Sequence, residues 1–275
     1  MTAPTPGPLG KTVAYASHYD AGLLFAMPRA PKRTDLGIGA ALPFHGVDVW
    51  NAYELSWLDT RGKPVVALAE FRIPAASPNI VESKSFKLYL NSYNQARLVG
   101  VDELRLRLQH DLASATGAEV AVALRLPGES APIDCSELEG ESIDACAIDI
   151  DDYGPPNAAH LRLAADAREV EESLTSDLLK SNCPVTGQPD WASVQVRYTG
   201  AAIDRVGLLR YLISFREHAE FHEHCVERIF VDLMRRCMPA RLSVYARYTR
   251  RGGLDINPWR GTATATPPNP RGARQ

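Results

Sequence analysis

The sequence lacks the patterns of several common classes of protein. Its five cysteines form an odd, scattered set without a Cys-x-x-Cys pair, so the ligand spacing of a zinc ribbon is absent. The segment FHEHCVERIF misses the HExxH spacing of a metalloprotease, because Val226 stands four residues after His222. We therefore predict that the protein holds no metal.

Long apolar runs and export signals are missing as well. No stretch approaches the roughly 18 apolar residues of a membrane span. The N-terminus has no basic start followed by an apolar core, as a signal peptide would. We expect a cytoplasmic protein with no membrane partner, in which the thiols stay reduced and can act as nucleophiles.

An excess of positive charge is also absent. The net charge is −3 and the pI is near 6.2, so direct binding of nucleic acid has no global electrostatic support. The segment GIGAAL at residues 37–42 lacks the third glycine of the dinucleotide fingerprint and follows no clear strand. Any nicotinamide cofactor would have to bind without a Rossmann fold, and the predicted partner is a small molecule.

The 275 residues, 45% of them apolar, can fill the core of one large domain or two small ones. Two extended runs, GVDVWNAYELSW and VVALAEFRI, flank a turn with Asp59 and Gly62. The run VDELRLRLQHDLASAT predicts a helix that ends at Gly117 and leads into the strand VAVALRL. Periodicity leaves the segment SKSFKLYLN open between strand and helix.

The second half repeats this order of helix and strand. WASVQVRY alternates like a strand, AAIDRVGLLRYLISF and HEHCVERIFVDLMRRC predict helices, and ARLSVYARY returns as a strand. Between the halves, residues 128–152 contain no Lys or Arg and many acidic residues, which is typical of a solvated connector. The predicted domains are an N-terminal module 1–127, an acidic linker 128–160, a C-terminal module 161–260 and a flexible tail 261–275.

A thiol and a carboxylate stand close together in SNCPVTGQPDW, which its Pro and Gly content predicts to be a loop. Cys183 could be a small buried apolar residue, and Asp190 could simply close a turn. The functional alternative makes Cys183 a nucleophile and Asp190 a general acid, whose pKa rises beside a thiolate or an apolar ring. Such a pair suits an electrophile whose heteroatom gains a proton as its carbon is attacked.

Two further groups could bind a ligand. Glu82 and Glu223 each stand at an apparent helix start, where carboxylates could accept hydrogen bonds from the donor edge of a purine-like ring. The basic segments ESKSFK and RYTRRGG, the second with Gly252 and Gly253, could bind phosphate groups.

Taken together, ESKSFKLY, SNCPVTGQPDW, FHEHCVERIF and RRGGLDINPWR resemble the NADPH-dependent 7-cyano-7-deazaguanine reductases of the QueF type, in their long two-module form. The resemblance covers nearly the whole chain. It implies an α+β fold of tandem tunnelling-fold (T-fold) modules, with antiparallel sheets and paired helices that assemble around a barrel. It also implies a homodimer that uses NADPH to reduce the nitrile of a free 7-deazapurine on the pathway to queuosine.

The resemblance further implies a role for each matching residue. Cys183 would attack the nitrile carbon to form a covalent thioimide while Asp190 protonates the nitrogen. Substrate would contact Val81, Glu82, Ser83, Phe221, His222 and Glu223. NADPH would contact Ser83, Lys84, Arg251 and Gly252. Because Glu82 and Cys183 belong to different predicted modules, the resemblance implies a pocket between modules or subunits.

Two other interpretations stay open on the sequence. A zinc-dependent pterin cyclohydrolase shares the tunnelling fold and could use Cys183, His222 and Cys225 as metal ligands. A binding module without catalytic activity could retain the purine pocket alone. Zinc content and turnover distinguish these from a nitrile reductase.

Overall fold

The computed structural model describes residues 16, 18–128 and 135–275 and divides into two compact units. The first comprises the described residues of Met1–Pro31, Val49–Pro132 and Arg251–Asp255, and the second those of Lys32–Asp48, Ile133–Arg250 and Ile256–Gln275. Each unit therefore includes a segment that is distant in sequence. The module limits 1–127 and 161–260 stay a prediction.

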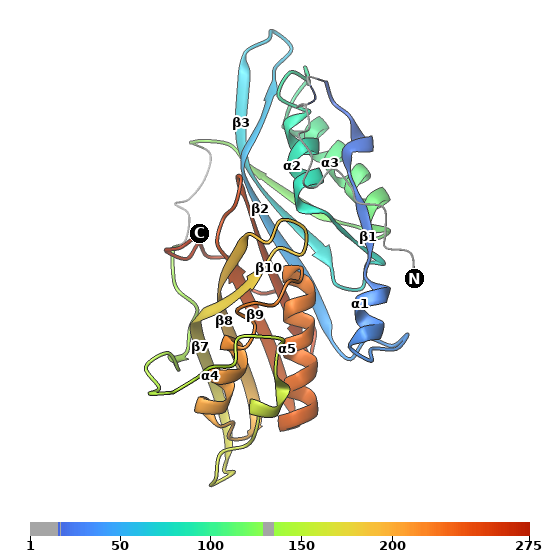
Figure 1. Ribbon diagram of the computed structural model, residues 1–275. Helices are drawn as coiled ribbons and strands as arrows, with labels where there is room; N and C mark the ends of the chain where they lie inside the picture. The colour runs from blue at the N-terminus through green and yellow to red at the C-terminus, as the bar shows by residue number, and fades with distance from the viewer. Residues whose placement is uncertain (1–15, 17, 129–134) are drawn as a thin grey trace. The chain divides into compact units, whose positions relative to one another are not determined.

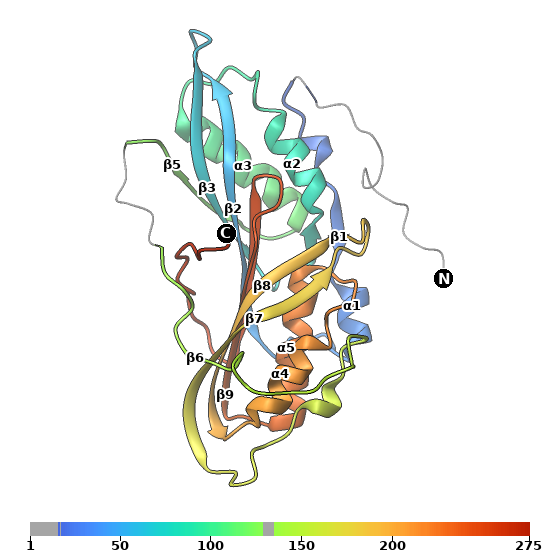
Figure 2. The same ribbon diagram turned by 60° about the vertical axis from the view of Figure 1, so that its left-hand side comes forward.

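The first unit is built on the strands β2 (His45–Leu58), β3 (Pro64–Pro74) and β5 (Ala121–Arg125), in the order β5-β3-β2. Its helices α2 (Ser83–Asn91) and α3 (Val101–Thr116) lie together on one side of these strands (Figure 2). A separate antiparallel pair joins β1 (Ala26–Pro28) to β4 (Asn79–Val81). Alternate residues of β3, namely Ala67, Ala69, Phe71 and Ile73, are buried, as expected for a strand with one covered face.

Helix α2 resolves the segment that periodicity left open. Glu82 caps this helix, because its carboxylate accepts the backbone N–H groups of Lys84 and Ser85, both at 2.7 Å. Phe86 then packs edge-on against Trp50 and Phe71, with ring centroids 5.3 and 5.0 Å apart. The helical state is thus decided by a carboxylate cap and by aromatic packing against the sheet.

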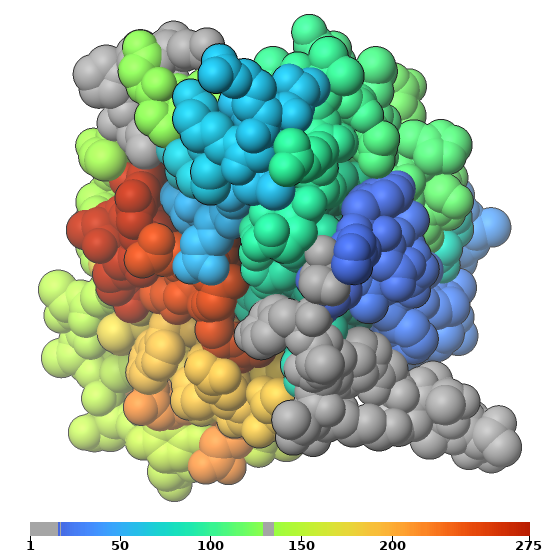
Figure 3. Space-filling model, turned by 90° about the horizontal axis from the view of Figure 1, so that it is seen from above, coloured from blue at the N-terminus to red at the C-terminus, as the bar shows by residue number. Residues whose placement is uncertain are grey.

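Helix α3 ends where the sequence predicts, at Gly117, whose φ of 74° is the left-handed conformation of a helix C-terminus. The short helix η1 (Ala21–Leu23) lies beside α2, and the blue N-terminal surface adjoins the green one in Figure 3. Tyr19 and Tyr89 both donate to the buried carboxylate of Asp111, at 2.7 and 2.6 Å. These bonds fasten the chain before β1 to the two helices.

The second unit contains the strands β6 (Glu141–Ser142), β7 (Glu169–Asn182), β8 (Pro189–Ala201), β9 (Arg241–Tyr248) and most of β10 (Leu254–Gly261). Their order is β10-β9-β8-β7-β6, antiparallel apart from the short parallel pair β6–β7. Helices α4 (Arg205–Ile213) and α5 (His222–Cys237) cover one face of this sheet (Figure 1). The short helices α1 (Ala30–Asp35) and η2 (Ala158–His160) complete the elements.

The same order of elements occurs twice along the chain. Apart from the short β4 between β3 and α2, two strands, two helices and one strand follow each other as β2, β3, α2, α3, β5 and again as β7, β8, α4, α5, β9. The fold is therefore α+β with antiparallel sheets, as predicted. Within the described part of each unit the strands form an open sheet, so the barrel assembly stays a prediction.

One strand lies outside the sequence predictions. Strand β7 was not predicted, because a register shift between Ser176 and Leu179 interrupts the alternation of its buried residues. The residues after Gly261 contact the second unit: Tyr245 donates to the carbonyl oxygen of Pro268 at 3.1 Å, and Arg274 contacts Asp177. The flexibility of the tail 261–275 stays a prediction. No helix in the described residues is long and apolar enough to cross a membrane.

Candidate active site

The predicted nucleophile and acid lie on a tight β-hairpin. Strand β7 ends at Asn182, and the connection covers only residues 183–188. The N–H of Cys183 donates to the carbonyl oxygen of Gln188, and the N–H of Gly187 donates back to that of Cys183, both at 2.9 Å. The loop is therefore shorter than predicted, and Asp190 belongs to strand β8, paired with Ser181 of β7. Both candidate side chains are buried.

Asp190 has an imidazole beside it. Its Oδ2 lies 3.4 Å from Nε2 of His222, the first residue of α5. The His222 ring is stacked on the ring of Tyr248, at the end of β9, with centroids 3.7 Å apart and planes 4° from parallel. The structure thus brings two predicted site residues together, and adds an aromatic platform that the sequence did not reveal.

Backbone hydrogen bonds join the nucleophile hairpin to the start of α5. The N–H of Asn182 donates to the carbonyl oxygen of His218 at 2.8 Å, and the N–H of Glu220 donates to that of Asn182 at 3.1 Å. Cys183 is the next residue along one strand of this bridge, and Phe221, the N-cap of α5, is the next along the other. The bridge therefore fixes Cys183 relative to the three predicted substrate contacts at residues 221–223.

Glu220, a residue of this bridge that the sequence did not single out, carries a buried carboxylate with two basic neighbours. The carboxylate of Glu220 lies 3.5 Å from Nδ1 of His224 and 3.2 Å from Nζ of Lys32. Burial on its own would raise the pKa of Glu220, but the neighbouring His224 imidazole and the ammonium group of Lys32 hold this pKa at about 2. Glu220 therefore stays ionised next to the bridge.

Cys225 lies on α5 and differs from Cys183 of the hairpin in its surroundings. It is fully buried, and burial raises its pKa to about 12. A thiol with such a pKa stays protonated at neutral pH, so Cys225 is a poor nucleophile. Groups of three or more His, Cys, Asp or Glu side chains placed to hold a metal do not occur in the described residues.

In the first unit, the predicted substrate contacts are consecutive. Val81 ends β4, Glu82 caps α2, and Ser83 and Lys84 begin that helix. Glu82 is only 1% exposed, and burial raises the pKa of its carboxyl group although the two backbone N–H donors and nearby lysines oppose the shift. A carboxylate can accept about four hydrogen bonds, so the two cap bonds leave capacity for a ligand.

The predicted cofactor contacts Arg251 and Gly252 lie in a turn against α2. Gly252 and Gly253 have φ values of 59° and 76°, which two-residue hairpin turns require and glycine adopts easily. A Cβ on Gly252 would lie 3.1 Å from Nζ of Lys87. Lys87 lies three residues after Lys84, on the same helix and about one turn along, so this cation joins the predicted phosphate contacts. Lys87 is the last residue of ESKSFK, the basic segment that was predicted from the sequence to bind phosphate.

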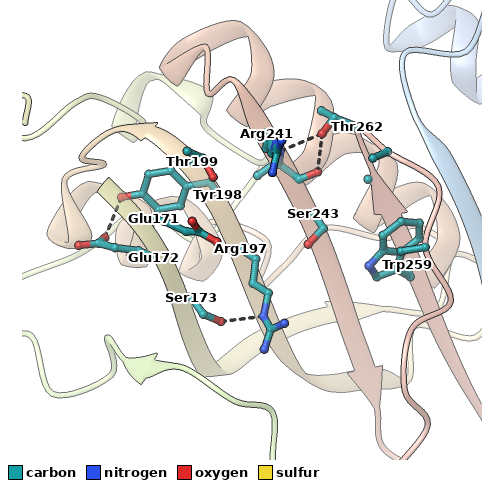
Figure 4. Close-up of a pocket in the computed structure, with 14 residues that line it drawn as sticks. Glu171, Glu172, Ser173, Arg197, Tyr198, Thr199, Arg241, Ser243, Trp259 and Thr262 are labelled. Carbon is teal, nitrogen blue, oxygen red and sulfur yellow. Dashed lines mark hydrogen bonds between the residues drawn. The ribbon is translucent and has the colours of Figure 1, made fainter. Parts of the chain in front are cut away.

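A cavity of about 410 Å³ lies elsewhere in the second unit and is lined by residues of β7, β8, β9 and β10 (Figure 4). Four of its polar side chains are paired with each other: Tyr198 donates to Glu172 at 2.8 Å, and Arg197 donates to Ser173 at 3.3 Å. None of the predicted site residues lines it. The cavity is therefore a poor candidate for the substrate site.

Comparisons with known proteins match this arrangement along the chain. The family model described as "Nitrile reductase, 7-cyano-7-deazaguanine-reductase N-term" matches residues 15–124, and that described as "QueF-like protein" matches residues 189–267. The NADPH-dependent 7-cyano-7-deazaguanine reductase of Bordetella pertussis is 63% identical over 269 residues, covering 98% of each chain. The chain belongs to the QueF nitrile reductase family.

Other QueF reductases show similar identity. Those of Chromobacterium violaceum and Cupriavidus necator are each 58% identical, over 274 and 280 residues. The first alignment covers 99% of this chain and 98% of the relative, and the second covers 100% of both. A solved structure, the apo form of an archaeosine synthase QueF-Like, aligns to 35% of this chain and 96% of its own at 17% identity, and its TM-score of 0.31 does not bear on the fold or function.

The two matched ranges contain nearly all the predicted site residues. Glu82 and its neighbours lie in the first, and Asp190, Glu223 and Arg251 lie in the second. Cys183 lies between them. Its place in the site therefore stays a prediction, which the hairpin geometry supports.

Proposed function

We propose that this QueF protein uses NADPH to reduce the nitrile of 7-cyano-7-deazaguanine to the aminomethyl group, in queuosine biosynthesis. The observation that carries the proposal is the β7–β8 hairpin, which places Cys183 beside the bridge to α5 and Asp190 against His222. A nucleophile and an acid on one hairpin suit attack on a carbon whose heteroatom must gain a proton.

The first step joins the substrate to the protein. The thiolate of Cys183 adds to the nitrile carbon, one π pair of the C≡N bond moves to nitrogen, and that nitrogen takes the proton of Asp190. The product is a covalent thioimide, and Asp190 is left as a carboxylate that must be reprotonated before the next cycle. Because a nitrile has no good leaving group, this step creates the electrophilic carbon that direct reduction lacks.

Substrate orientation falls to the residues at the two helix starts. Glu82 and Glu223 would accept hydrogen bonds from the N–H and amino groups of the ring, and both are buried, so each bond would form away from competing water. Val81, Ser83 and His222 would complete the contacts, and Phe221 would stack on the base. Since the contacts of Glu82 and Glu223 with the ring leave the nitrile unpaired, these two carboxylates set binding rather than the rate of addition.

The residues near α2 fit an anionic cofactor. Ser83, Lys84 and Lys87 on the helix, together with Arg251 and Gly252 in the turn, would hold the phosphate groups of NADPH. The absence of a side chain on Gly252 leaves the turn's backbone accessible beside Lys87. When bound, NADPH supplies the two hydrides that the conversion of a nitrile to an amine requires.

The repeated order of elements supports the same assignment at the level of the fold. We propose that the two copies are tandem tunnelling-fold modules, and that chains assemble as a cytoplasmic homodimer around a barrel. The free base would be the substrate, so no direct contact with nucleic acid is needed, in agreement with the net charge of −3.

The test is NADPH oxidation, followed by the nicotinamide absorbance, with 7-cyano-7-deazaguanine as substrate. We expect two NADPH oxidised per amine formed by the wild type, and none by Cys183→Ala. Cys237→Ala is the matched control, because Cys237 is also buried, at the far end of α5. Full activity of Cys183→Ala would remove the thiol from the mechanism. Activity that requires stoichiometric zinc would favour the cyclohydrolase, and tight binding without turnover would favour a binding module.

A further inference from the structure

The imidazole of His222 has few polar restraints. Its Nε2 makes one long contact, 3.4 Å, to Asp190. Its Nδ1 is buried and has no hydrogen-bond partner among the described residues. A single long contact does not fix the plane of a ring, so the parallel stack on Tyr248, at 3.7 Å and 4°, is the main restraint on that plane.

Tyr248 itself is held rigidly. Its ring is fully buried. Its backbone N–H donates to Oδ1 of Asn257 at 3.1 Å, and its carbonyl oxygen accepts from Nε2 of Gln275 at 3.1 Å. It is also paired with Ala192 of β8, two residues from Asp190 on the same strand. The platform and the carboxylate are therefore fixed to neighbouring strands of one sheet, which sets their relative position.

We propose that Tyr248 is a positioning residue for the acid of the reaction. Its ring holds the edge of His222 towards Asp190, and His222 in turn keeps the Asp190 carboxyl group in the orientation from which it protonates the nitrile nitrogen. This inference rests on the proposed function. It adds a role for a residue that contacts neither the substrate nor the reacting atoms, and acts through His222.

The ring, and not the hydroxyl group, is the part that acts. The Tyr248 hydroxyl is buried beside the thiol of Cys225 and forms no hydrogen bond of ordinary geometry within the described residues. Phenylalanine would keep the stacked face without leaving a buried donor unpaired. Methionine would fill a similar volume with a flexible chain that offers no flat face.

The experiment measures thioimide formation in the absence of NADPH. Each protein is mixed with 7-cyano-7-deazaguanine and quenched at short times, and intact mass spectrometry follows the gain of one substrate mass. We compare wild type, Tyr248→Phe, Tyr248→Met and the control Tyr245→Met. Tyr245 lies on the same strand with 2% exposure, and its hydroxyl group contacts Pro268 in the tail. Substrate affinity and the thermal midpoint are measured for each variant.

We expect Tyr248→Met to form the adduct roughly tenfold to a hundredfold more slowly, since a small misplacement of a catalytic group costs rates of that order. Its substrate affinity should change less than threefold, because Glu82 and Glu223 still bind the ring. Tyr248→Phe and Tyr245→Met should each stay within about twofold of the wild-type rate.

Three results would overturn the proposal. One is a wild-type rate for Tyr248→Met. Another is a slow Tyr248→Phe, which would assign the role to the hydroxyl group and decides the matter even where Tyr248→Met does not fold. The third is an equal loss in Tyr245→Met, which would indicate general destabilisation. A wild type that forms no adduct and oxidises no NADPH refutes instead the proposed function.

Discussion

Replacing Glu227 by Gln should destabilise the second unit strongly. Glu227 lies on α5, one turn after Glu223, and is fully buried. Its carboxylate accepts from Arg33 at 2.7 and 3.0 Å and from Arg260 at 2.9 and 3.2 Å. Arg260 also donates to Asp48 at 2.8 Å, so two cations and two carboxylates balance in the interior.

The size of the effect follows from this balance. Gln keeps the shape of Glu227 but removes the negative charge that accepts from two buried guanidinium groups. Breaking a buried pair on one side typically costs about 3–5 kcal/mol. At about 2–4 °C per kcal/mol for a protein of this size, the thermal midpoint should fall by about 6–20 °C.

Calorimetry of wild type and Glu227→Gln at pH 7 measures that change. Asp102→Asn is the matched control, because Asp102 pairs with Arg105 at 3.0 Å but its side chain is 81% exposed, and exposed pairs contribute at most about 1 kcal/mol. A fall of under about 2 °C for Glu227→Gln would refute the reasoning. It would mean that water or a local shift compensates the two arginines.

Two more predictions follow from groups near the candidate site. His224 and Lys32 hold the pKa of Glu220 at about 2, below its ordinary 4.5. Glu220 therefore stabilises the fold fully above about pH 5 and loses this contribution as pH falls towards 2. The thermal midpoint should fall less steeply with falling pH in Glu220→Gln than in wild type, and parallel curves would contradict this. Gly252→Ala places a Cβ 3.1 Å from Nζ of Lys87 at a φ of 59°. The KM for NADPH should rise about tenfold, while the rate of thioimide formation without NADPH stays unchanged. Slowed thioimide formation would contradict the assignment of this turn to the cofactor.

The sequence predicts those helices and strands whose ends are set by turn or capping residues close by in the chain. Helix α3 was predicted because Gly117 ends it, and the β2–β3 hairpin because Asp59 and Gly62 supply the turn. Strand β7 was missed because its bulge at residues 176–179 disrupts the period of two. Helix α2 stayed open because the packing of Phe86 against Trp50 and Phe71 involves tertiary partners, which periodicity does not show.

In the candidate site, too, the sequence predicts residues that are close in the chain and misses contacts between distant segments. Cys183 and Asp190 were found because they stand seven positions apart in a segment rich in Pro and Gly, although the loop between them is shorter than expected. The stack of His222 on Tyr248 depends on the packing of α5 against the end of β9, which no local pattern encodes. The contact of Lys87 with the glycine turn likewise joins segments about 165 residues apart, so only the folded chain reveals it.

The backbone bridge between Asn182 and residues 218–220 limits how this enzyme could be re-engineered. The same pair of hydrogen bonds that seats Cys183 also seats the first turn of α5, where Phe221, His222 and Glu223 would meet the substrate. A substitution that shifts this turn to admit a larger nitrile would also displace Cys183, because the two segments are joined by these hydrogen bonds. Substrate range and reactivity are thus mechanically linked, and libraries that vary residues 221–223 should vary the hairpin 181–190 at the same time.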